Sequence, residues 1–193
     1  MKNSEFYLNA YEKYGISARG LNWNSDASQK IRFEVITYFI QNELSSCSVV
    51  DAGCGFADLY LFWEEKGLRP KSYIGIDSVQ NSINISKKRL KKFPSCSFTC
   101  RDILKDELYL ADWYIASGSL NVLSDFDTWL FLEKILSYSK KGIIFNILKG
   151  EKKSETFNYQ NRENIIQFAK EKDLKIRVIE DYLKNDMSIE IRK

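Results

Sequence analysis

The sequence predicts a doubly wound α/β fold, in which a mostly parallel sheet of seven strands lies between layers of helices. After residue 45, apolar strand-like runs alternate with helix-like stretches, which is the pattern of a parallel sheet covered on both faces. The last two strand candidates are joined only by "LKNDM", which is too short for a parallel crossover and typical of a hairpin. The final strand should therefore be antiparallel. We expect residues 1–193 to form one domain, with 1–45 as an N-terminal helical flap and 46–193 as the core.

Seven stretches have the length and apolar content of strands. They are "SVVDAG", "KSYIGID", "SFTCRDI", "DWYIASG", "GIIFNIL", "KIRVIEDY" and "MSIEIRK".

Helix signals lie between these strands. Ser78 is expected to cap a helix that ends near the basic run "KKRLKK", where lysines favour the negative end of the helix dipole and remain solvated. Asp125 and Asp127 are expected to open the next helix, and Asn161 to cap a third. Their apolar residues fall on one face at helical spacing.

The segment before residue 45 has a different character. It is punctuated by glycine and asparagine in "YGISARGLNWN" and then becomes helical in "SDASQKIRFEVITYFI". Ser25 is the expected cap of that helix, and Ile31, Val35 and Phe39 are in register along it. We expect this flap to lie against the sheet.

Composition restricts the class of protein. With 44% hydrophobic and 28% charged residues the chain is a compact globular protein, neither disordered nor fibrous. The 29 basic and 26 acidic residues give a net charge of +3, which does not indicate a nucleic-acid partner, although it does not exclude one. No stretch reaches the ~18 consecutive apolar residues of a membrane span. The N-terminal "MKNSEFYLNAYEKYG" lacks the apolar centre of a secretory signal, so we expect a cytoplasmic protein without a membrane partner.

The chain contains no histidine, which has two consequences. Hydrolytic schemes of the Ser-His-Asp or Cys-His kind are excluded. A zinc site would need all four cysteine thiolates, and their spacing is not that of a zinc ribbon, so we expect no metal and four reduced thiols. The four are Cys47, Cys54, Cys96 and Cys100.

The stretch "VVDAGCGFAD" forms the turn out of the first strand, at the edge where open α/β sheets bind ligands. A dinucleotide fold has the pattern G-x-G-x-x-G there, but Asp58 occupies the third glycine position and would bring a negative charge to a pyrophosphate. The stretch also fits acid-x-Gly-x-Gly-x-Gly, with Asp51, Gly53, Gly55 and the small Ala57.

Two further acids follow the next two strands. "YIGID" places Asp77 at the end of the second strand, where an acid can accept hydrogen bonds from both hydroxyls of a ribose. "TCRDIL" places Asp102 just after the third strand, and "ADWYIASGSLNVL" contains the fourth strand and its exit. The parallel strands should bring these groups to one edge of the sheet.

Together these motifs resemble those of the class I S-adenosylmethionine-dependent methyltransferases, over nearly the whole chain. The resemblance implies a Rossmann-like fold and S-adenosylmethionine as cofactor. It implies that the glycines let the loop backbone approach the cofactor, that Asp51 organises the loop, and that Asp77 binds the ribose. In the same way, Asp102 and the amide of Ile103 would bind the adenine. The cofactor-binding residues expected on this basis are Asp51, Gly53, Cys54, Gly55, Asp77, Ser78, Asp102, Ile103, Ser117 and Gly118.

The sequence departs from the family pattern at Ala57. It also lacks the Asn/Asp-Pro-Pro-Tyr motif of enzymes that methylate base or amide nitrogens, and neither Pro70 nor Pro94 precedes a cysteine as in cytosine-5 enzymes. Those substrates are therefore less favoured.

The substrate side rests on fewer signals, and no catalytic residue is assigned. We expect the flap to fold over the cofactor, with Arg32 or Arg19 meeting its carboxylate and Trp23 forming a wall of the substrate pocket. Ser117, Asn121 and Tyr182 are further candidates for substrate-facing groups. In each case an ordinary structural role is the alternative.

The sequence thus predicts a methyltransferase that acts on a small-molecule acceptor. The alternatives are a methyltransferase of RNA or protein, a module that binds a nucleoside without catalysis, and an NAD-dependent oxidoreductase. Neither the acceptor nor the oligomeric state is predicted.

Overall fold

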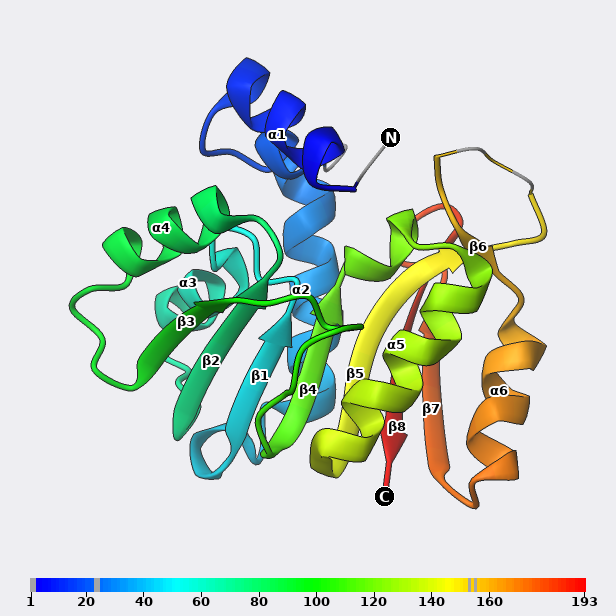
Figure 1. Ribbon diagram of the computed structural model, residues 1–193. Coiled ribbons are helices and arrows are strands. Elements are labelled where there is room, and N and C mark those ends of the chain that lie inside the picture. Colours follow the sequence, from blue (N-terminus) through cyan, green and yellow to red (C-terminus); the bar gives the residue numbers. More distant parts are fainter. Residues whose placement is uncertain (1–2, 23–24, 153, 155) are drawn as a thin grey trace.

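The computed structural model describes residues 3–22, 25–152, 154 and 156–193 (Figure 1). All seven predicted strands are present. They are β1 (Ser48–Ala52), β2 (Ser72–Asp77), β3 (Cys96–Cys100), β4 (Ala111–Ser117), β5 (Ser139–Lys149), β7 (Lys175–Glu180) and β8 (Asp186–Arg192). A short additional strand, β6 (Tyr159–Gln160), pairs with the end of β5. A strand of two residues shows no alternation of apolar and polar side chains, so β6 was not predicted.

The strands form one sheet in the order β3-β2-β1-β4-β5-β8-β7, with β6 beside β5 outside this path. Strand β8 is antiparallel to both of its neighbours, and the other pairings are parallel. The hairpin predicted from the short final connection is therefore confirmed. It places β8 inside the sheet, between β5 and β7.

Six α-helices and three short 3₁₀ turns connect the strands in the described residues. The helices are α1 (Asn3–Tyr14), α2 (Asp26–Ile40), α3 (Asp58–Glu65), α4 (Gln80–Arg89), α5 (Asp125–Tyr138) and α6 (Arg162–Glu171). The turns are η1 (Arg19–Leu21), η2 (Leu44–Ser46) and η3 (Ser119–Val122). None of these helices is long and apolar enough to cross a membrane.

The helix caps follow the sequence in two of three cases. Ser25 caps α2 by accepting a hydrogen bond from the Ser28 amide, and Asn161 caps α6. The prediction for Ser78 is wrong, because α4 begins two residues later with Val79 as its N-cap. Asp77, the residue before Ser78, accepts a hydrogen bond from the Val79 amide at 2.8 Å.

Helices cover both faces of the sheet (Figure 1). Helices α2 and α3 pack on one face in a cluster that includes Phe33, Ile36, Tyr60 and Trp63. On the other face, α5 and α6 pack in a second cluster. Helix α1 lies at the end toward which the parallel strands point, and the Tyr11 ring meets Phe56, after β1, edge-on at 5.9 Å. The N-terminal segment therefore covers the edge where the predicted site residues gather.

The basic run and the cysteines lie where the sequence placed them. Lys87, Lys88 and Arg89 occupy the last turn of α4, and the two lysines are exposed. All four cysteines are free thiols. Cys47 and Cys54 are buried, whereas Cys100 is exposed at the end of β3.

Candidate functional site

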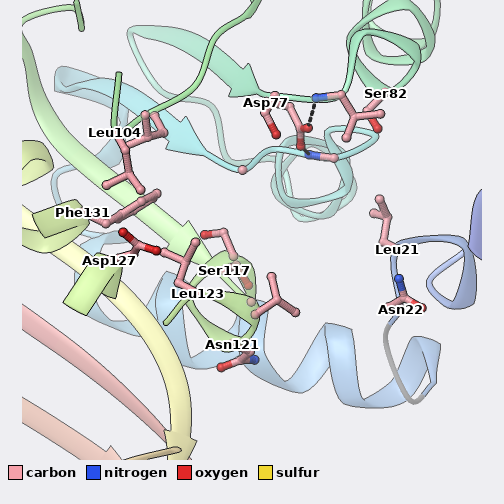
Figure 2. Close-up of a pocket in the computed structure, with 18 of the residues that line it drawn as sticks. Leu21, Asn22, Asp77, Ser82, Leu104, Ser117, Asn121, Leu123, Asp127 and Phe131 are labelled. Atoms are coloured by element: carbon pink, nitrogen blue, oxygen red, sulfur yellow. Dashed lines mark hydrogen bonds between the residues drawn. The ribbon is translucent and has the colours of Figure 1, made fainter. Parts of the chain in front are cut away.

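A cavity of about 1170 Å³ lies at the carboxyl edge of the parallel strands, beneath the N-terminal segment. Figure 2 shows Asp77 on one side of it, Ser117 and Asn121 on its floor, and Leu21 and Asn22 of the flap on another side. Most of the predicted site residues line this cavity: Arg32, Gly53, Gly55, Asp77, Ser78, Asp102, Ile103, Ser117, Gly118 and Asn121. The strand order has thus brought together groups from five separate stretches of the chain.

The loop after β1 depends on its glycines for both conformation and space. Gly53 and Gly55 have φ angles of +87° and +53°, a region that residues with a side chain rarely adopt. A Cβ on Gly53 would lie 2.5 Å from the Cβ of Ser119. Ala57 also has a positive φ, of +61°, and is the N-cap of α3. The third position of the motif therefore keeps a glycine-like conformation although the residue is alanine.

Asp77 is held at the cavity by backbone hydrogen bonds. Its Oδ2 accepts from the Gly55 amide at 2.9 Å and its Oδ1 from the Val79 amide (Figure 2). Burial raises the pKa of this carboxyl, and the two amides oppose that effect. Each carboxylate oxygen has a further lone pair, so Asp77 can still accept hydrogen bonds from a ligand.

Asp102 lies in the connection between β3 and β4, which contains no helix among the described residues. Its carboxylate pairs with the Lys105 ammonium at 2.8 Å and accepts from the Leu104 amide. Partial burial acts to raise the pKa of Asp102, but the hydrogen bonds from Lys105 and Leu104 outweigh it and hold the pKa below its ordinary value. Asp102 is therefore a charged acceptor at the cavity wall.

Asp51 lies behind the glycine loop rather than on the large cavity. With Cys54, it lines a small adjoining pocket against Gln29 and Phe33 of α2. The Tyr73 hydroxyl donates a hydrogen bond to Asp51 at 2.5 Å. Burial raises the pKa of Asp51 to about 7; the Tyr73 hydrogen bond opposes the shift, and the nearby Asp77 adds to it.

A buried asparagine that the sequence reasoning missed organises the exit of β4. The Nδ2 of Asn146, in β5, donates to Ser117 Oγ at 3.1 Å, and its Oδ1 accepts from the Gly118 amide at 2.8 Å. Asn121 in turn accepts from the Leu148 amide. The only sequence signal for Asn146 was a single amide in the otherwise apolar "GIIFNIL".

Arg32 reaches the cavity from α2 and is buried against the final hairpin. Its Nε donates to Asp186 Oδ2 at 2.6 Å, and the Tyr182 hydroxyl donates to Asp186 Oδ1 at 2.7 Å. Tyr182 also shares a hydrogen bond with Ser188, so it stands behind Arg32, away from the cavity lining. The geometry does not support Tyr182 as a substrate-facing group. Trp23 lies outside the described residues, and Arg19 is in η1.

Comparison with known proteins extends this picture. The model of a family described as "Methyltransferase domain" matches residues 43–178. No curated protein matches the chain in sequence.

Solved structures share the fold at low sequence identity. Magnesium protoporphyrin IX methyltransferase from Synechocystis, with bound S-adenosylmethionine, has a TM-score of 0.73 at 12% identity, covering 100% of this chain and 98% of its own. The 1,6-didemethyltoxoflavin-N1-methyltransferase from Burkholderia thailandensis has a TM-score of 0.73 at 10% identity, covering 99% and 87%. An S-adenosylmethionine-dependent methyltransferase from Clostridium acetobutylicum has a TM-score of 0.67 at 13% identity, covering 99% of both chains. Because the family match spans more than half of its residues, this chain belongs to the methyltransferase domain family, as the motifs at its strand ends predicted.

Proposed function

We propose that the protein is an S-adenosylmethionine-dependent methyltransferase that acts on a small-molecule acceptor, with residues 1–45 and 46–193 working as one domain. The observation that carries this proposal is the meeting of the glycine loop, Asp77 and Asp102 at one cavity. Three strand ends that are distant in the sequence supply these groups. If the glycine loop were only a tight turn between a strand and a helix, the two acids would not need to lie at the same cavity.

The residues present fit this cofactor. Asp77 retains acceptor capacity for the two ribose hydroxyls, while Asp102 and the Ile103 amide suit the adenine edge. Gly53 and Gly55 place bare backbone at the cavity, and Ser117 and Gly118 line the end assigned to the methionine part. Carboxylates also attract a cationic cofactor without phosphates, whereas they would repel the pyrophosphate of a dinucleotide.

The chain contributes position rather than acid–base chemistry. When bound, S-adenosylmethionine supplies a methyl group on a positively charged sulfur. Holding an acceptor atom in line with such a carbon provides most of the rate enhancement, so no dedicated base is required. This agrees with a cavity that has carboxylates, hydroxyls and amides but no histidine.

The size of the cavity supports a small acceptor. A ligand pocket for one small molecule is typically about 300–1,000 Å³. A cavity of about 1170 Å³ exceeds that and has room for a nucleoside cofactor together with a compact acceptor. An RNA or protein methyltransferase, the second candidate, would need a basic or extended surface continuous with the cavity mouth.

Thermal unfolding with added ligands tests the proposal. S-adenosylmethionine or S-adenosylhomocysteine, at 100 times its dissociation constant, should stabilise the protein by about 2.7 kcal/mol, and NADH should not. The opposite pattern would identify a nicotinamide-dependent enzyme. Binding of S-adenosylhomocysteine, followed by failure to methylate any member of a broad metabolite panel, would leave a binding module in place of an enzyme.

A further inference from the structure

The two ends of the cavity are built from different residues and carry different charges. At one end, carboxylates come from the end of β2 and from the connection after β3, namely Asp77, Asp102 and Asp106. We call the opposite end the acceptor end. It is formed by α2, the end of β5, strand β6 together with Phe157 just before it, and the β7–β8 hairpin. Its lining residues are Arg32, Leu148, Phe157, Tyr159, Lys184 and Asn185.

The sheet register explains why these residues meet. Leu148 pairs with Tyr159 on one side and with Asp186 on the other, so the three form one row across the sheet. Two residues earlier in β5, and so two rows away, Asn146 pairs with Ser117 and Ser188. Side chains two residues apart on a strand share a face. The acceptor end therefore continues directly from Ser117, at the exit of β4.

The acceptor end contains two basic side chains. Arg32 and Lys184 line it. The carboxylate that lines the cavity nearest to them in the fold is Asp127, whose neighbour Thr128 accepts a hydrogen bond from Asn158. Asp186, the partner of Arg32, is 1% exposed and lies behind the guanidinium. The Lys184 ammonium has no ion-pair partner among the described residues. A cation without a partner at a cavity wall attracts an anionic group of a ligand.

Two aromatic rings provide flat surfaces at the same end. Phe157 is 39% exposed although it lines the cavity. Neither Phe157 nor Tyr159 stacks on another ring within the described part of the chain, and the Tyr159 hydroxyl has no hydrogen-bond partner there. Aromatic side chains with free faces favour planar ligands.

We propose that the acceptor end binds the methyl acceptor, and that this acceptor is a planar small molecule carrying a negatively charged group such as a carboxylate or phenolate. The inference rests on the proposed function, because it assigns the rest of the cavity to the cofactor. The anionic group lies toward Lys184 and the plane of the molecule lies against Tyr159 and Phe157. Since Ser117 adjoins this end, the acceptor is adjacent to the position assigned to the methyl group.

Binding of three matched probes to the protein saturated with S-adenosylhomocysteine tests the inference. The probes are 2-naphthoate, 2-naphthamide and decahydro-2-naphthoate, measured by ligand-observed NMR titration. The planar anion should bind about tenfold more tightly than either the neutral amide or the non-planar anion, because each of those lacks one of the two features recognised.

Variants locate the effect. Lys184→Gln should reduce the preference for naphthoate over naphthamide to about twofold, while Lys184→Arg should retain it. Tyr159→Ala should reduce the preference for the planar probe. Lys170→Gln, which removes an exposed charge on α6 outside the cavity lining, serves as the control and should change neither ratio.

The outcomes separate the two proposals. If S-adenosylhomocysteine does not bind, the proposed function fails. If it binds but naphthoate and naphthamide bind equally, or if naphthoate displaces S-adenosylhomocysteine, the acceptor assignment is overturned while the cofactor assignment stands. A preference that Lys184→Gln leaves unchanged would also overturn it.

Discussion

The two ends of the cavity differ in how the chain builds them. At the cofactor end, Gly53 and Gly55 lie within three residues of the end of β1 and Asp77 is the last residue of β2, and these neighbouring strands bring them together. At the acceptor end, Arg32 of α2 meets Asp186 of β8 although 154 residues separate them in sequence. Short local motifs are thus sufficient for the cofactor end, whereas the acceptor end depends on contacts between distant parts of the fold.

The largest effect is expected at the acceptor end. Asp186→Ala should lower the free energy of unfolding by about 3 to 5 kcal/mol, because it leaves the Arg32 guanidinium buried without its carboxylate. Urea unfolding measures the loss. The double variant Arg32→Met/Asp186→Leu should lose less than the single variant, since it removes both charges. A single-variant cost below about 1 kcal/mol would show that the long-range pair does not support this end.

The cofactor end should respond to pH through Asp51. Its pKa of about 7 in the folded protein exceeds the ~3.9 of an unperturbed aspartate, so the folded state binds the proton more tightly. The contribution of Asp51 to stability is therefore complete below about pH 4, decreases by up to about 4 kcal/mol between about pH 4 and 7, and is absent above that range. Asp51→Asn should remove this contribution. Urea unfolding of both proteins from pH 5 to 8 provides the comparison, and parallel profiles would contradict it.

Ligand binding at the cofactor end should depend on Asp77. Asp77→Ala should weaken S-adenosylhomocysteine binding at least about tenfold, since a charge-assisted hydrogen bond contributes about 1.5 to 3 kcal/mol. Calorimetric titration gives the dissociation constants. Glu171→Ala, which removes an exposed acid on α6, is the control and should bind normally. Unchanged affinity in Asp77→Ala would remove this residue from the cofactor site.

The smallest effect is expected at the start of α2, the helix that carries Arg32. Ser25→Ala should cost about 1 kcal/mol of stability, because it removes the acceptor for the Ser28 amide, and Ser25→Asp should retain the cap. Chemical unfolding measures the loss of stability, and titrations with S-adenosylhomocysteine and with 2-naphthoate measure the effect on binding at each end of the cavity. S-adenosylhomocysteine affinity should change less than naphthoate affinity, and equal losses would mean that α2 supports both ends alike.

The sequence predicted most accurately those features that depend on residues close together in the chain. The seven long strands, the closing hairpin and the caps at Ser25 and Asn161 each depend on neighbouring residues, and each is confirmed. The three acids were expected at one edge of the sheet, and the structure places Asp77 and Asp102 on the cavity with Asp51 close behind.

The sequence predicted the partners of individual polar side chains less well. Tyr182 was expected to face the substrate, but Asp186 and Ser188 engage its hydroxyl. Asn146 and Asp186 were overlooked because a lone polar residue in or beside an apolar strand does not reveal its partner. Ser78 was mistaken for a cap because serine is a common N-cap residue, whereas α4 begins with Val79 as its N-cap.

The interior position of β8 affects the order in which the sheet can be completed during synthesis. The ribosome synthesises β8 (residues 186–192) after all of the other strands, yet β8 lies between β5 and β7 in the sheet. Until it emerges, both neighbours present open backbone edges, which are prone to pairing with other chains. A nascent polypeptide stalled before β8 should therefore be a preferred client of chaperones, although six of the seven long strands have already been made.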